Sequence, residues 1–331
     1  MMLSDLGAEV LRIEREAGNG WPNPVMDRGR AMLRLDIRTE EGAAQVTRIA
    51  DRGDVLIEGM RPGVMERLGL GPDPLLKRNP ALIYGRVTGW GQDGPLARTA
   101  GHDLNFIALT GALAAIGREG SPPPPLNLIG DFGGGSLYLT VGILAALWER
   151  NRSGLGQVVD AAIVDGVASM MTMFAGLLPS GRIAVERDRN LLAGAAPFYR
   201  CYECADGKYV AVGPLEPQFF AELVQQLGLP SQISTAQYDE AQWPAMTERL
   251  AAAFITRPRD AWAAQFEGSD ACVSPVLDLR DCAEHPHNAE RQAYEVREGV
   301  LHAKPSPRFS RTPVRIADPI DAAELLRRWD V

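Results

Sequence analysis

The sequence contains one imidazole and two carboxylates at positions that suit acid–base chemistry. His102 is one of only four histidines, and it stands beside Asp103 at the start of the apolar stretch AGHDLNFIALTG. Asp131 lies in NLIGDFGGGS, directly before three glycines, and Glu216 lies in GPLEPQFF. Histidine and carboxylates form the usual set of general acids and bases. Each position also allows a structural role, and sequence spacing alone does not show that the three groups meet.

Asp131 precedes a long apolar segment that we expect to be helical. The free amides and positive end of a helix stabilise a nearby anion, and glycines allow a ligand to approach the backbone closely. A carboxylate at this position could be a base, a nucleophile or a helix cap. The segment lacks the G-x-G-x-x-G spacing of a dinucleotide loop, which argues against NAD binding.

Glu216 follows the apolar run YVAVG and precedes Pro217. A proline in the first turn of a helix makes the preceding residue the N-cap. Taken alone, this pattern predicts a structural role for Glu216.

The first half of the chain alternates strand and helix patterns, which predicts an α/β fold with a parallel sheet. The expected strands are residues 10–14, 54–58 and 80–91, and Thr39 is the expected N-cap of the helix between the first two. Ligands on such sheets bind at the carboxyl ends of the strands. These ends are residues 14–15, 58–61 and 88–91.

The second half predicts a buried apolar helix over residues 137–154, a strand and a second apolar helix from about Val167. A polar, Arg-rich stretch follows at residues 181–192. From about residue 197 to 295, a hairpin around Asp206 and Gly207 and several helices indicate an α+β block. The chain ends in an amphipathic helix.

Composition excludes several classes of protein. The chain has 331 residues and a net charge of −8, which argues against general affinity for nucleic acid or anionic membranes. The sequence predicts no apolar run long enough to cross a bilayer and no signal peptide, so a cytoplasmic location is expected. Cys201 and Cys204 form a single C-x-x-C, which without further ligands does not predict a metal site.

Several motifs together resemble the family III CoA-transferase superfamily, and within it the 2-methylacyl-CoA racemases. The resemblance spans essentially the whole chain and includes DLGAEVLRIER, DVLIEGMRPGVMERLGLGPD, NPALIYGRVTGWGQDGP, PLNLIGDFGGGSLYLTVGILAALWER and YECADGKYVAVGPLEPQFF. The GHD motif at residues 101–103 separates the racemases from the transferases, which usually lack this histidine. The resemblance implies a Rossmann-like large domain, a smaller α+β domain and an interlocked homodimer. The implied limits are a CoA-binding large domain over 1–165, a linker over 166–196, a small domain over 197–295 and a return to the large domain over 296–331.

The resemblance also implies the site residues. His102 and Asp131 would be the two catalytic bases, and Glu216 would reach His102 from the partner subunit, so that the active site lies at the subunit interface. CoA would stack its adenine on Arg15, place its phosphates near Arg67 and pass its thioester along residues 101–106, where Phe106 replaces a common tyrosine. The implied CoA contacts are Arg15, Leu35, Asp36, Ile37, Arg38, Gly59, Met60, Arg61, Arg67, Gly101, Asp103, Leu104, Asn105 and Phe106.

The activity implied is racemisation of 2-methylacyl-CoA thioesters through an enolate, in fatty-acid metabolism, with acyl-CoA as the substrate and no separate cofactor. One alternative is CoA transfer, in which Asp131 attacks the thioester. A second alternative is a CoA-binding protein without activity. Relative to the family pattern, the sequence starts about one strand–turn–helix unit late, on the order of two dozen residues, and we expect this difference to affect stability.

Overall fold

The computed structural model describes residues 1–18, 22–118, 120–318 and 320–331. These residues form two compact units, each described by itself. Unit 1 contains residues 1–107, 127–169 and 282–331, and unit 2 contains residues 108–126 and 170–281. The sequence predicted that residues 282–295 belong to the small domain, whereas the structure places them in unit 1. It predicted that residues 108–126 belong to the large domain, whereas the structure places them in unit 2.

Unit 1 contains a three-stranded parallel sheet in the order β3 (Val55–Glu58), β4 (Ile83–Thr88), β5 (Val158–Ala162). A separate parallel pair joins β1 (Val10–Glu14) to β2 (Arg30–Arg34). The prediction of parallel pairing is therefore confirmed, and β1 has the predicted bounds. However, β1 pairs with β2, which the sequence did not predict, and not with the sheet that contains β3 and β4. Residues 294–303 add an antiparallel hairpin, β9 (Tyr294–Arg297) and β10 (Val300–Ala303).

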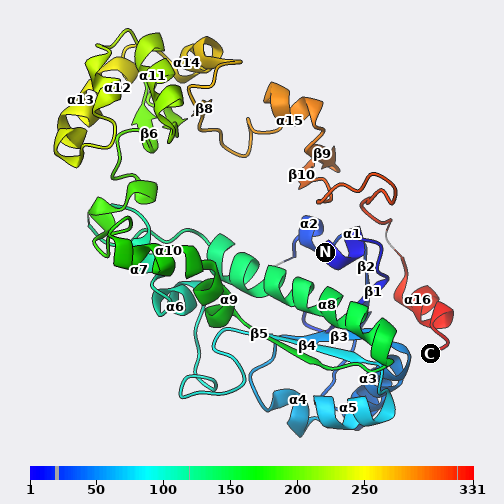
Figure 1. Cartoon of the computed structure of the whole chain (residues 1–331). Coiled ribbons are helices and arrows are strands. Elements are labelled where there is room, and N and C mark those ends of the chain that lie inside the picture. Colours follow the sequence, from blue (N-terminus) through cyan, green and yellow to red (C-terminus); the bar gives the residue numbers. More distant parts are fainter. Residues whose placement is uncertain (19–21, 119, 319) are drawn as a thin grey trace. The chain divides into compact units, whose positions relative to one another are not determined.

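Helices cover both faces of the three-stranded sheet (Figure 1). Successive residues of a strand point to opposite faces. Ile83 on β4 packs against Ile143 of α8 (Tyr138–Ser153). Tyr84, the next residue, packs with Ala50 of α3 (Glu40–Arg52) and Leu75 of α5 (Pro72–Arg78). Unit 1 is therefore a three-layer α/β/α structure in which β4 is buried on both faces.

Local signals explain where several of these helices begin. The Thr39 side chain accepts a hydrogen bond from the Gly42 N–H, which makes Thr39 the N-cap of α3 as predicted. Asp321 caps α16 (Ala322–Arg328) in the same way. The remaining helices of unit 1 are α1 (Met2–Asp5), α2 (Pro24–Asp27), α4 (Val64–Arg67), α6 (Asp103–Ala108, whose last residue falls in unit 2), α9 (Ile163–Met170) and α15 (Pro286–Glu290).

The apolar helix near residue 137 departs from the prediction in two ways. It starts earlier, because residues 128–137 form a π-helix, η1 (Leu128–Leu137), that runs directly into α8. It is also not buried all round, since Val141 is 66% and Trp148 is 73% exposed. The run Leu128–Ser153 is the one single helix among the described residues that is long and apolar enough to cross a bilayer, so the expectation that no run reaches this length is wrong. Here it packs against the sheet.

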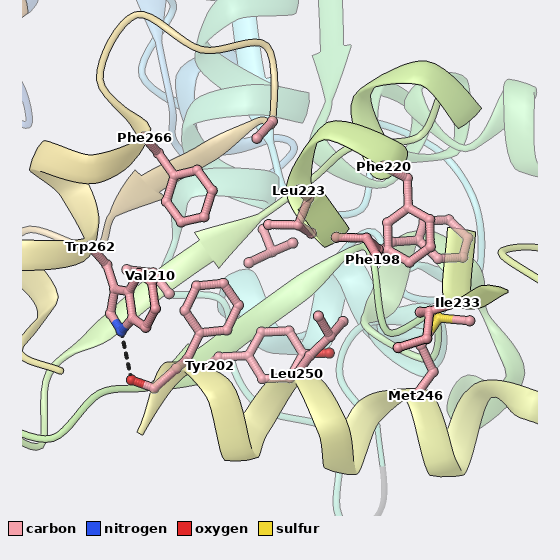
Figure 2. Packing of buried hydrophobic residues seen from close by; sticks show 14 of the residues in the cluster. Phe198, Tyr202, Val210, Phe220, Leu223, Ile233, Met246, Leu250, Trp262 and Phe266 are labelled. Carbon is pink, nitrogen blue, oxygen red and sulfur yellow. Dashed lines mark hydrogen bonds between the residues drawn. The ribbon is translucent and has the colours of Figure 1, made fainter. Parts of the chain in front are cut away.

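Unit 2 is an α+β structure around an antiparallel sheet, β6 (Arg200–Glu203), β7 (Tyr209–Val212) and β8 (Val273–Pro275). The predicted hairpin around Asp206 and Gly207 is confirmed by the pairing of β6 with β7. An aromatic core that includes Phe198, Tyr202 and Phe254 lies between this sheet and the helices (Figure 2). The helices are α7 (Ala112–Ala115), α10 (Thr172–Leu177), α11 (Pro217–Gln226), α12 (Gln232–Thr235), α13 (Trp243–Phe254) and α14 (Arg259–Phe266).

Candidate active site

A pocket of about 470 Å³ lies in unit 1 at the carboxyl ends of the parallel strands. Its walls include residues 59–62, which follow β3, residues 87–90 at the end of β4, and Ile163, which follows β5. This is the edge of the sheet at which parallel α/β proteins bind ligands.

His102 and Asp131 both line this pocket. His102 directly precedes α6, and its carbonyl accepts hydrogen bonds from Asn105 N–H (2.8 Å) and Phe106 N–H (3.2 Å). The Asn105 side chain in turn accepts the His102 N–H at 3.1 Å. This reciprocal capping fixes the backbone of His102, while its imidazole stays exposed on the pocket wall.

Asp131 lies in the first turn of η1 and is half-buried. Burial raises the pKa of its carboxyl group, and the negative charge of Asp103 acts in the same direction. Two neighbours oppose this shift: the Asn127 side-chain amide, 3.4 Å from Asp131 Oδ2, and His102. His102 and Asp131 therefore face one pocket, and the charge of His102 acts on the Asp131 carboxyl group.

The three glycines after Asp131 have a different role from the one expected. They lie inside η1, so they are part of the helix and not a free loop. A β-carbon on Gly134 would lie 2.5 Å from Val167 Cγ2, and one on Gly166 would lie 1.9 Å from the Gly134 carbonyl oxygen. The glycines therefore let α9 pack directly against η1.

An aromatic pair forms another part of the pocket wall. Phe106 is buried and meets Trp90 edge to face, with ring centroids 4.8 Å apart. Glycines make room for the Phe106 ring, because a β-carbon on Gly89 would lie 2.0 Å from it and one on Gly101 would lie 2.7 Å from it. The pocket is therefore apolar beside the two titratable side chains.

Glu216 lies in unit 2, where it is exposed and is the N-cap residue of α11 with Pro217 in the first turn, as the sequence predicted. Its side chain makes no capping hydrogen bond. Burial and, after it, the charge of Glu216 raise the pKa of Tyr238 and of the Cys272 thiol. Glu216 thus remains free of the structural bond that its position would suggest.

The expected CoA contacts fall into two groups. The pocket is lined by the first group, which consists of Gly59, Met60, Arg61, Gly101 and Phe106. The second group, Arg15, Leu35, Asp36, Ile37, Arg38, Arg67, Asp103, Leu104 and Asn105, does not line it.

In that second group, Arg15, Asp36 and Arg38 follow strands of the β1–β2 pair. Arg15 follows β1 and is exposed, and its Nε donates to the Gly18 carbonyl at 2.7 Å. Asp36 and Arg38 pair through two bonds of 2.9 Å, which lower the pKa of Asp36 to about 2. Arg67 is exposed at the end of α4. Arginine side chains of this kind can bind phosphate groups.

The predicted strand end at residues 88–91 supplies the lining residues Thr88 and Trp90, whereas the sequence missed Ser136 and Ile163. Ser136 lies one π-helical turn after Asp131, and its hydroxyl donates to the Asp131 carbonyl at 2.9 Å. A π-helix has no reliable sequence signature, so the five-residue spacing could not be recognised. Thr88 and Trp90, in contrast, lie at a strand end that the sequence predicted as a ligand-binding position. Among the described residues no group of His, Cys, Asp or Glu could hold a metal ion.

The fold and the pocket define a class: an α/β protein whose pocket, at the carboxyl ends of its parallel strands, combines an aromatic wall with a histidine and an aspartate. Comparison with known proteins narrows this class. Residues 1–320 match the model of CoA-transferase family III, and the chain belongs to that family.

Similar proteins include both racemases and transferases. Alpha-methylacyl-CoA racemase from mouse (Mus musculus) is 45% identical over 315 residues, which cover 95% of this chain and 82% of that protein. Succinyl-CoA–D-citramalate CoA-transferase from Chloroflexus aurantiacus is 36% identical over 246 residues, which cover 69% of this chain and 60% of that protein. The crystal structure of a CAIB/BAIF family protein from Brucella suis superimposes with a TM-score of 0.81 at 26% identity, covering 99% of this chain and 94% of the other.

Proposed function

We propose that this protein is an enzyme that racemises 2-methylacyl-CoA thioesters by removing and returning the α-proton. The observation that carries the proposal is the presence of His102 and Asp131 in one pocket at the carboxyl ends of the strands. The higher identity to a racemase than to a CoA-transferase supports this reaction within the family.

In the proposed reaction one of the two side chains removes the α-proton of the bound thioester. The carbon–hydrogen bond breaks, and its electron pair moves onto the thioester oxygen to give an enolate. The other side chain, in its protonated form, then delivers a proton to the opposite face of the same carbon. His102 and Asp131 exchange roles for the other enantiomer, so that no atom is gained or lost overall.

The environment of Asp131 suits a group that must both give and take a proton. A helix N-terminus stabilises a carboxylate, which disfavours proton donation. Burial raises the pKa of Asp131, and this brings the acid form closer to the working pH. The enolate oxygen also needs hydrogen-bond donors, and the first backbone N–H groups of α6 lie next to His102 in the chain.

We further propose that the enzyme works as a homodimer in which Glu216 comes from the partner subunit. The exposed apolar side chains of α8, including Val141 and Trp148, support a partner on this face. The proposal requires no cofactor beyond the CoA part of the substrate, and a cytoplasmic role in fatty-acid metabolism remains a prediction.

Proton NMR of a chiral 2-methylacyl-CoA in deuterated buffer tests the reaction. The probe is (S)-2-methyldecanoyl-CoA. We expect the α-hydrogen signal to disappear with the enzyme present, while the product becomes racemic. Racemisation without any deuterium uptake would contradict the enolate scheme.

The family name favours one alternative, CoA transfer. In that reaction Asp131 would attack the thioester carbonyl, a carbon–oxygen bond would form, and CoA would leave as the thiolate to give an acyl-aspartyl anhydride. Hydroxylamine would then trap the acyl group, and labelled free acid would appear in the thioester pool. Exchange of the α-hydrogen without either signal would exclude this alternative.

A further inference from the structure

One buried carboxylate in the site has no task in the proposed chemistry. Asp103 is the first residue of α6 and only 8% exposed. Its Oδ1 accepts a hydrogen bond from the backbone N–H of Asp131 at 2.7 Å, although the two residues are 28 positions apart. Asp103 therefore joins the segment that carries His102 directly to the residue that carries the second catalytic group.

The helix geometry makes this bond important for Asp131. The first N–H groups of a helix have no carbonyl partner within it. In η1 the hydrogen bonds run five residues back, and the first of them joins Phe132 N–H to the Asn127 carbonyl at 3.2 Å. Asp131 stands one position before that bond, and its N–H is satisfied by Asp103.

Gly130, the residue before Asp131, leaves room for the contact between Asp103 and Asp131. A β-carbon on Gly130 would lie 2.2 Å from Asp103 Oδ1 and 2.7 Å from its Cγ. Gly130 is buried, and the Asp103 carboxylate would have to move away to make room for a β-carbon there. Glycine at position 130 therefore leaves the space that the Asp103 carboxylate needs to reach the Asp131 backbone.

We infer that Asp103 is a positioning residue that holds the backbone of Asp131, and with it the carboxyl group, at a fixed place relative to His102. The inference rests on the proposed proton transfer. It replaces the expectation that Asp103 contacts CoA, because the Asp103 side chain is buried against Asp131 and does not line the pocket.

The charge of Asp103 should also affect the pH dependence of activity, which can be measured separately from kcat. The charged groups that act on the Asp131 carboxyl are Asp103, which raises its pKa, and His102, which lowers it. Removal of the Asp103 charge is therefore expected to lower the pKa of Asp131. In the direction of the reaction that uses Asp131 as the base, activity falls at acid pH as Asp131 becomes protonated. Without the Asp103 charge, this fall should occur at a lower pH.

The experiment measures α-hydrogen exchange of (S)-2-methyldecanoyl-CoA by the full chain and its variants. Asp103→Ala removes the acceptor, and misplacement of a catalytic group by about 1 Å typically costs on the order of a hundredfold in rate. We expect kcat to fall by about that factor while KM changes little. Asp103→Asn keeps an acceptor oxygen, so we expect it to recover most of kcat and still to shift the acid limb to lower pH.

Gly130→Ala tests the contact without changing Asp103. Its β-carbon pushes the carboxylate away from Asp131, so kcat should fall, and in the Asp103→Ala background it should cost little more. Asp321→Ala is the matched control, because Asp321 also accepts backbone N–H groups at a helix start but lies in α16, away from the pocket. It should leave kcat unchanged.

The outcomes separate the inference from the function. If the unaltered chain does not exchange the α-hydrogen, the proposed reaction is wrong. If it does, and Asp103→Ala keeps the same kcat and the same acid limb, the positioning role is wrong. If Asp103→Ala does not fold, Gly130→Ala decides, and unchanged kcat in that folded variant overturns the inference.

Discussion

Asp131 illustrates, at the scale of one residue, how a reactive group costs stability. Its pKa is raised by burial, so the folded protein binds its proton more tightly than the unfolded chain does. Its contribution to stability is therefore fully present below the unfolded pKa and is lost as the pH rises through the folded pKa. At neutral pH the Asp131 carboxylate is ionised although it is partly buried, and this lowers the stability of the folded protein.

Asp131→Asn should consequently raise the melting temperature at pH 7. This gain should shrink as the pH falls through the raised pKa of Asp131 and should vanish below about 4, where the carboxyl is protonated in both states. The same variant should lose at least about a hundredfold in α-hydrogen exchange, because it removes one acid–base group. Thermal unfolding followed by circular dichroism across pH checks the first part. A variant that is less stable at pH 7 would contradict it.

The pKa of Asp36 is shifted in the opposite direction to that of Asp131. Arg38 lowers the pKa of Asp36 to about 2, so its contribution to stability is present above the unfolded pKa and is lost as the pH falls towards 2. Asp36→Asn should therefore lower the melting temperature slightly at pH 7 and not at pH 2. The pair is well exposed, so the effect is small.

At the scale of the elements, a buried ion pair ties the ends of β3 and β4 to the pocket. Arg86 Nε donates to Glu58 Oε1 at 2.8 Å, and both side chains are buried. Glu58 Oε2 accepts the Met60 N–H at 2.6 Å, which fixes the segment 59–62 that lines the pocket. Arg86 also contacts Glu66 of α4 at 2.8 Å.

Glu58→Leu should destabilise the protein by about 3 kcal/mol, because it leaves the Arg86 guanidinium buried with less compensation. It should also lower exchange activity, because Met60 loses its tether. Chemical denaturation measures the stability change. Asp330→Ala, which removes an exposed pair with Arg52, should cost less than about 1 kcal/mol and serves as the control.

The double variant Glu58→Leu/Arg86→Met separates the two effects. With no buried charge left behind, much of the lost stability should return. Activity should stay low, because the Met60 N–H still lacks its acceptor. If stability and activity both recovered in the double variant, the ion pair would act on the pocket only through global stability.

The elements also show how much of this structure local sequence determines. The 10–14 strand, the helix capped by Thr39 and the 206–207 hairpin follow from patterns within about fifteen residues, and all three are confirmed. The π-helix was not predicted, because its glycines indicate a loop unless the packing of α9 is known. The Asp103–Asp131 bond depends on a contact between distant segments, which no local pattern encodes.

At the scale of the whole molecule, the apolar side chains of α8 need an explanation. Val141 and Trp148 are both more than 60% exposed in the single chain, and large exposed apolar side chains on one helix are typical of an interaction surface. A homodimer through this face would cover them. Trp148→Asp should then give a monomer by light scattering at micromolar concentration, whereas Phe309→Ser, which removes an exposed aromatic side chain of unit 1 outside α8, should leave the dimer intact.

Subunit mixing tests whether the active site is shared between chains. Co-expression of a His102→Ala chain and a Glu216→Ala chain with different tags allows purification of the mixed dimer. If His102 of one chain works with Glu216 of the other, one site of the mixed dimer carries both altered residues and the second site carries neither. The mixed dimer should then have about half the activity of the unaltered dimer, although each parent dimer is inactive. If each chain builds its own site, both sites of the mixed dimer contain one altered residue, and the activity should stay at the level of the parents. The folding of each variant chain is verified in its own homodimer.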